Sequence, residues 1–129
     1  MAITLTQEQP NLVVINLGTN WTWLDIERDS EKNNAKIQAI PGQVTVIMYS
    51  EDKSPMPKGS TFAMVRKIVR TSPTNIRMTY IVTQTLFSRL ALGAVLRANP
   101  ALRAKMMLAP SLDEARRLYA EQHMTSKSV

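Results

Sequence analysis

The residues that could carry chemistry are few in this chain, and several of them lie between residues 51 and 61. Glu51 and Asp52 are adjacent carboxylates that directly follow an apolar segment. One or two carboxylates, completed by water molecules, are a common way for a protein to hold Mg²⁺. Adjacent acidic residues in a loop are more often simply solvated, however. We therefore predict no metal site and no cofactor.

Lys58, Ser60 and Thr61 stand where a helix is predicted to begin. The unpaired backbone N–H groups and the positive dipole end of a helix start attract anions and phosphate groups. Ser60 and Thr61 are therefore the candidate anion-binding or phosphorylation residues. Ser and Thr in this position more commonly cap the helix, and capping is the role that we favour for both.

Acid–base and nucleophilic groups are scarce in the rest of the sequence. His123 is the only histidine, at the end of the last predicted helix, and the chain contains no cysteine. A Ser–His triad, a cysteine nucleophile and a His-rich or Cys-rich metal site therefore each lack a necessary part. The four scattered glycines form no phosphate-binding loop. We therefore expect a protein that is not an enzyme.

The chain is basic, because 16 Lys and Arg residues against 10 Asp and Glu residues give a net charge of +6. A basic protein can bind nucleic acid, an anionic membrane or an acidic partner. Nucleic-acid-binding surfaces usually interleave aromatic with basic residues, and aromatic residues are only 5% of this chain. We therefore predict no specific nucleic-acid partner, only weak DNA binding that is lost at physiological salt.

Short apolar segments alternate with helical patterns along the whole chain. Strands are predicted over residues 3–6, 12–17, 43–49, 76–83 and 104–109. Helices are predicted over residues 23–39, 59–70, 85–97 and 112–122. This order, β-β-α-β-α-β-α-β-α, favours one α/β domain over residues 1–123, with a single mixed sheet of about five strands and about four helices. Residues 124–129 are expected to form a disordered tail.

Local signals support several of these boundaries. Thr22 and Asp25 have the spacing of a helix-start capping box, and Ser111 and Glu114 repeat that spacing before the last helix. The Asn99-Pro100 pair is predicted to break the third helix. A common core is expected from Val14, Val46, Ile47, Ile81 and Val82.

The first predicted helix has an unusually thin apolar stripe. Its members are Trp23, Ile26, Ile37 and Ile40. Asp29, Ser30 and Asn33 interrupt the stripe in the middle of the helix. A helix that packs on a core normally shows a wide and continuous apolar face, so we expect most of this helix to be solvated.

No apolar run in the sequence approaches the ~20 residues of a membrane-spanning helix. The first residues also lack the basic region followed by an apolar region that marks a signal peptide. We therefore expect a cytoplasmic protein without a transmembrane segment.

The order of elements and two stretches resemble the STAS-like domains, the family of the anti-sigma-factor antagonists. The stretches are NWTWLDIERDSEKNNAKIQAIPGQVTVIMYSE and SRLALGAVLRANPALRAKMMLAPSLDEARRLYAE. The resemblance implies a mixed sheet in the order 1-3-2-4-5, with the first strand antiparallel at an edge. In the antagonists a phosphorylated Ser or Thr, preceded by Asp in a D-x-[ST] turn, begins the helix after the third strand. Here Asp52-Lys53-Ser54 has the letters but precedes the helix, whereas Ser60 and Thr61 have the position without the aspartate.

These observations favour a non-enzymatic regulatory module that binds a protein partner, or a second copy of itself as a homodimer. The contact would use the loop and helix after the third strand, where Met56 offers an adaptable apolar contact and the cations suit an acidic partner. The predicted partner-binding residues are Ser54, Met56, Lys58, Arg66, Lys67 and Arg70.

The first alternative is a sensor of a small molecule or anion, bound near the helix starts at Ser60 and Thr85. An enzyme is a second alternative, which the missing acid–base groups disfavour. The partner-binding and ligand-binding hypotheses predict different surfaces. A ligand-binding domain has a closed apolar pocket with a few inward polar groups. A domain that binds a protein partner has an exposed apolar patch instead.

Overall fold

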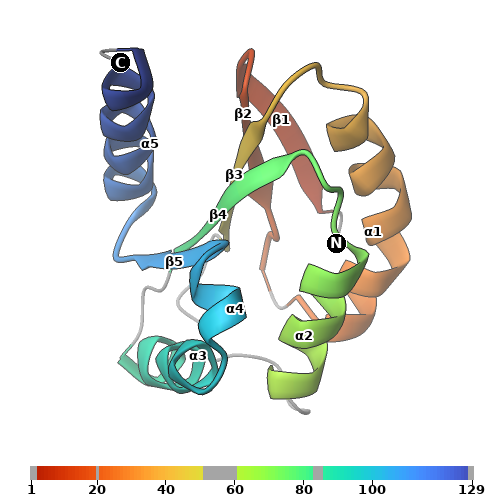
Figure 1. Ribbon diagram of the computed structural model, residues 1–129. Helices are drawn as coiled ribbons and strands as arrows, with labels where there is room; N and C mark the ends of the chain where they lie inside the picture. The colour runs from red at the N-terminus through yellow and green to blue at the C-terminus, as the bar shows by residue number, and fades with distance from the viewer. Residues whose placement is uncertain (1–2, 20, 51–60, 83–85, 128–129) are drawn as a thin grey trace.

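The structure, a computed structural model, describes residues 3–19, 21–50, 61–82 and 86–127 of the chain. Its centre is a five-stranded sheet with the strand order β1-β2-β3-β4-β5 (Figure 1). The strands are β1 (Thr4–Gln9), β2 (Leu12–Asn16), β3 (Val44–Tyr49), β4 (Ile76–Val82) and β5 (Met106–Ala109). β1 pairs antiparallel with β2, and the other neighbours are parallel. The predicted α/β fold with one mixed sheet is therefore confirmed.

The strand order 1-3-2-4-5, which the family resemblance implied, is wrong. Only a turn at Pro10 and Asn11 separates β1 from β2, and so short a connection makes the two strands an antiparallel hairpin. The hairpin leaves β1 at the edge of the sheet, while β3 pairs with the other side of β2. The antiparallel edge position of the first strand agrees with the resemblance.

Four helices cover one face of the sheet and the fifth covers the other (Figure 1). They are α1 (Trp23–Gln38), α2 (Thr61–Thr71), α3 (Leu86–Ala98), α4 (Pro100–Arg103) and α5 (Leu112–Lys127). From β2 onward, each crossover joins a strand to its parallel neighbour in the same direction across the sheet. Because such crossovers are right-handed, they place α1, α2 and α3 on the same face. α5 follows the last strand and packs alone on the opposite face.

The sheet divides the predicted core into separate apolar layers. The predicted core residues are all buried or half-buried: Val14, Val46, Ile47, Ile81 and Val82. Successive strand residues point to opposite faces, so Val46 packs on the side of α1 and Ile81 on the side of α3. The other three lie in the layer beneath α5.

The predicted capping box at the start of α1 is confirmed. The backbone N–H of Asp25 donates to Thr22 Oγ1 over 3.1 Å, and the backbone N–H of Thr22 donates to Asp25 Oδ2 over 2.9 Å. The bond from the Thr22 backbone lowers the pKa of the Asp25 carboxyl below its usual value. Three of the four residues of the predicted stripe are buried on this helix: Trp23, Ile26 and Ile37. The fourth, Ile40, lies beyond the end of α1.

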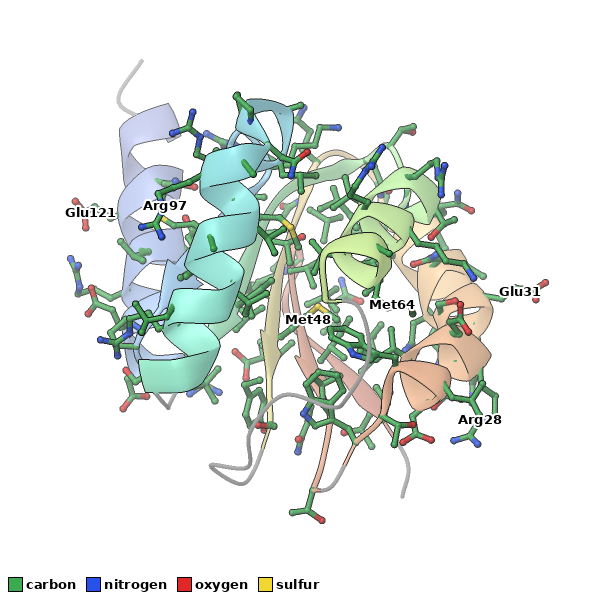
Figure 2. All side chains as sticks on the ribbon, turned by 90° about the horizontal axis from the view of Figure 1, so that it is seen from below. Arg28, Glu31, Met48, Met64, Arg97 and Glu121 are labelled. Atoms are coloured by element: carbon green, nitrogen blue, oxygen red, sulfur yellow. The ribbon has the colours of Figure 1, made fainter. Side chains whose placement is uncertain are left out.

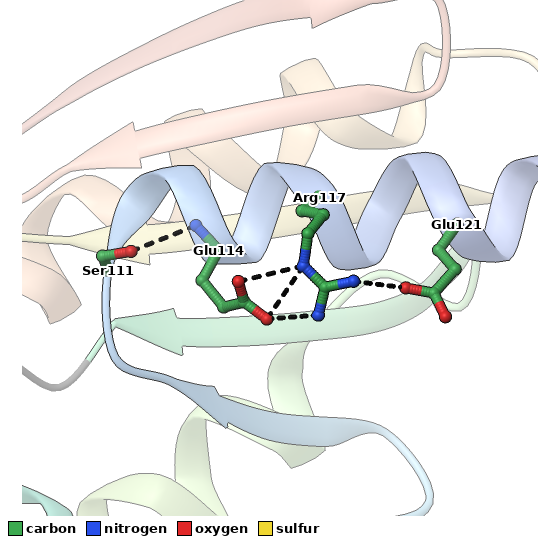
Figure 3. Close-up of polar contacts among 4 residues, drawn as sticks. All are labelled: Ser111, Glu114, Arg117 and Glu121. Atoms are coloured by element: carbon green, nitrogen blue, oxygen red, sulfur yellow. Dashed lines mark hydrogen bonds and ion pairs between the residues drawn. The ribbon is translucent and has the colours of Figure 1, made fainter.

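α5 begins with a hydrogen bond from the Glu114 backbone N–H to Ser111 Oγ over 3.1 Å (Figure 3). The Glu114 carboxylate forms an ion pair with Arg117, which also reaches Glu121 over 2.7 Å. The helix continues to Lys127, whereas the predicted helix ended at residue 122. Residues 123–127 include no Pro or Gly that would end a helix.

α4 is a short helix that the sequence analysis did not predict. Pro100, which was expected only to break the third helix, is the first residue of α4. Proline is well suited to the first position of a helix, where its missing N–H would have no partner anyway. The additional helix moves the start of β5 from the predicted residue 104 to Met106.

Within the part of the chain that the structure describes, each helix is too short or too polar to cross a membrane.

Candidate functional site

The structure places only part of the predicted partner-binding surface. Several of the candidate residues lie outside the described ranges: Glu51, Asp52, Ser54, Met56, Lys58, Ser60 and Thr85. Thr61 is the first residue of α2 and His123 belongs to α5, but their side chains are not among those described. The predictions for these residues stay predictions.

The three predicted cations of α2 are described, and all three are exposed: Arg66, Lys67 and Arg70. Lys67 forms an ion pair with Glu27 of α1. Lys67 and Arg70 also line a cavity between α1, α2 and the sheet. The structure therefore brings two of these cations to a site that the sequence analysis did not anticipate.

The cavity has a volume of about 410 Å³ and a largely apolar interior. Its sheet side is formed by Ile15, Val46 and Met48, and its helical walls include Ile37 of α1 and Ile68 of α2. In Figure 2, Met48 and Met64 lie among the side chains in the middle of the molecule, beside α2. In the same view Arg28 and Glu31 point outward from α1.

The cavity follows from the gap in the apolar stripe of α1. At helical spacing the inward positions are Trp23, Ile26, residue 30, residue 33 and Ile37. Ser30 and Asn33 occupy the two central positions and line the cavity. Because neither side chain is large and apolar, the space between this part of the helix and the sheet is not filled. The same gap was interpreted from sequence as the sign of a solvated helix.

Polar contacts span the seam between α1 and α2 above the apolar floor. One is the ion pair between Lys67 and Glu27. A second is the hydrogen bond from Asn34 Nδ2 to the carbonyl oxygen of Thr71, over 3.1 Å. The Ser30 hydroxyl donates to the Glu27 carbonyl oxygen of its own helix over 2.9 Å. The two helices are thus joined without closing the space between them.

The charges that line the cavity are mostly positive. Three cations contribute to its lining: Lys67, Arg70 and Lys105. Glu27 is the acidic residue among the lining side chains, and it is paired with Lys67. The uncompensated charge of the cavity is therefore positive.

A buried polar side chain also lies on the other side of the sheet. Tyr80 is fully buried on β4, facing α5, and its hydroxyl has no hydrogen-bond partner among the described residues. Burial raises the pKa of the Tyr80 hydroxyl, while the charge of Arg77 and the nearby Gln122 side chain act in the opposite direction. No group of three His, Cys, Asp or Glu side chains suited to a metal is found in residues 3–19, 21–50, 61–82 and 86–127.

No protein-family model, curated protein or solved structure matches this chain.

Proposed function

We propose that this protein is a non-enzymatic binding domain that holds a small molecule with an apolar body between α1, α2 and the sheet. The observation that carries the proposal is the cavity of about 410 Å³, which is within the range of roughly 300–1,000 Å³ of small-molecule sites. Its apolar floor, which polar and charged side chains surround, supports a ligand-binding domain over a partner-binding one. The small-molecule alternative is therefore the better supported of the two hypotheses.

The lining residues support binding rather than catalysis. Among the residues that the structure describes, the lining includes no His, Cys or Tyr, and the Glu27 carboxylate is engaged by Lys67. General acid–base catalysis needs a side chain that can exchange a proton with the substrate near the working pH. The chain has one histidine and no cysteine in total, which favours a ligand that is held and released unchanged.

The test is to fill the cavity from α1 and to measure binding of an uncharged apolar probe, 1-decanol. The double variant Ser30→Leu/Asn33→Leu completes the apolar stripe and puts two leucine side chains into the space. We expect it to bind 1-decanol at least tenfold more weakly than the wild type, measured by titration calorimetry. We also expect its free energy of unfolding, measured by denaturant titration, to be higher by about 1 kcal/mol, because filling a cavity adds buried apolar contacts.

The matched control is Arg28→Leu/Glu31→Leu, which makes the same change at the same spacing on the outer side of α1 (Figure 2). It removes one positive and one negative charge, so the net charge is unchanged. This variant should bind 1-decanol as the wild type does. Failure of the wild type to bind 1-decanol, or equal binding by all three proteins, would contradict the proposed function.

A second proposal keeps the regulatory, STAS-like role suggested by the family resemblance. Arg66 and Arg70 are exposed four residues apart on α2, so they lie on neighbouring positions of its surface. Such a pair can steer an acidic partner to the helix. On this proposal a protein partner or a second copy docks on α2, with or without a ligand in the cavity.

A further inference from the structure

We propose that the ligand is an amphipathic anion whose charged group is bound by Arg70 and Lys105 at one end of the cavity. The inference rests on the proposed function, since it names the chemical class of the molecule that the cavity takes.

The charges on the cavity wall favour an anion. Lys67 and Glu27 neutralise each other in their ion pair, which leaves Arg70 and Lys105 as the remaining charged residues of the lining. Among the residues that the structure describes, neither of these two forms an ion pair with a carboxylate. Both side chains are exposed, so their charges can interact with a ligand without first breaking an ion pair within the protein.

Arg70 and Lys105 belong to the same edge of the molecule. Arg70 is in the last turn of α2, which runs back along the sheet and ends beside the start of β4. Lys105 directly precedes β5, and its carbonyl oxygen accepts a hydrogen bond from the Thr79 N–H of β4 over 2.8 Å. Since parallel strands begin at one edge of a sheet, both cations lie where β4 and β5 begin.

The segments of the chain that form this edge contain no acidic residues over long stretches. No Asp or Glu occurs in residues 66–79 or 94–106, the segments that bring α2, α3 and α4 to the starts of β4 and β5. Glu8, near the β1–β2 turn, is held by Arg116 of α5 at 2.7 Å. The local field at this end of the cavity is therefore positive and attracts an anionic group.

The helix dipole is enough to explain a cation at the position of Arg70, but it does not explain Lys105. A cation in the last turn of a helix is stabilised by the helix dipole, which accounts for Arg70. Lys105 lies between α4 and β5 and belongs to neither element. The hydroxyls of Thr71 and Ser72 are engaged by carbonyl groups of α2, because Thr71 Oγ1 donates to the Lys67 carbonyl and Ser72 Oγ to the Ile68 carbonyl. The two cations are the charged groups that this end of the cavity offers to a ligand head.

The other end of the cavity is apolar. It reaches Leu17 and Met48, near the carboxyl ends of β2 and β3, and Ile26 in the first half of α1. A ligand with a carboxylate or phosphate at Arg70 and Lys105 would therefore extend its apolar chain toward these residues.

The experiment compares two probes of equal chain length, decanoate and 1-decanol, by titration calorimetry at neutral pH and physiological salt. We expect the wild type to bind decanoate at least tenfold more tightly than 1-decanol. The double variant Arg70→Gln/Lys105→Gln should lose at least tenfold in decanoate affinity and keep its 1-decanol affinity.

The matched control is Arg97→Gln/Arg103→Gln, which removes two exposed cations that do not line the cavity. It should change decanoate binding by less than twofold. Equal loss in both double variants would show a general field effect and overturn the assignment to Arg70 and Lys105. Equal affinity of the wild type for the two probes would overturn the anion inference and leave the proposed function standing. Absence of binding by both probes would overturn the two together.

Discussion

At the scale of single residues, the important positions are those that depart from a simple apolar core. Ser30 and Asn33 leave the middle of α1 without the side chains that would fill the space above the sheet. Lys67 then joins α2 to Glu27 across that space. Two small polar residues and one ion pair are therefore enough to change a packed layer into a cavity.

Asp25 gives a residue-scale prediction about pH. Its hydrogen bonds at the start of α1 lower its pKa below the ordinary value of 3.8. A carboxyl with a lowered folded-state pKa stabilises the fold fully above its unfolded-state pKa, and this stabilisation is lost as the pH falls through the folded-state pKa. The wild type should therefore melt above Asp25→Asn at neutral pH, and the difference should shrink below about pH 4. A difference in melting temperature that stays constant from neutral pH to pH 3 would contradict this role.

At the scale of elements, most helices and strands could be predicted, because their signals are local. β-Branched apolar runs give β2 and β3, and the Thr22 and Asp25 spacing gives the start of α1. α4 could not be predicted in the same way, since Pro100 is compatible both with breaking one helix and with starting another. The strand order depends on the hairpin joining β1 to β2 rather than on the family resemblance.

The candidate site was less predictable than the elements that form it. The gap at Ser30 and Asn33 was visible in the sequence, but it is equally expected for a helix that faces water. Only the packing of α1 beside α2 over the sheet distinguishes the two cases. Arg70 and Lys105 are far apart in the sequence, and no local pattern indicates that they line one cavity.

The two sides of α2 give an element-scale prediction that separates the two proposed functions. Reversal of charge by Arg66→Glu, at a position of α2 that does not line the cavity, should release an acidic protein partner, if the outer side of the helix binds one. Ser30→Leu/Asn33→Leu should leave such a partner bound, because those residues line the cavity. The measurement is a pull-down with each folded variant as bait. A partner that binds the charge-reversed protein as well as the wild type would contradict docking on α2.

At the scale of the whole molecule, the fold gives its two faces different roles. α5 covers one face with a closed apolar layer that contains the fully buried Ile47 and Tyr80. The other face carries α1, α2 and the cavity. Sequential right-handed crossovers place these helices side by side, so one weakly apolar helix among them leaves a cavity while the opposite layer maintains the fold.

The most direct test of the central claim is to locate a bound molecule by NMR, using isotope-labelled Ile and Met methyl groups and unlabelled decanoate. We expect intermolecular nuclear Overhauser effects from the decanoate chain to Met48, Met64 and Ile68, which line the cavity. We expect none to Ile47, which faces α5 on the other side of the sheet. Contacts to Ile47, or saturable binding without any contact to the three cavity residues, would contradict the claim that this protein holds its ligand between α1, α2 and the sheet.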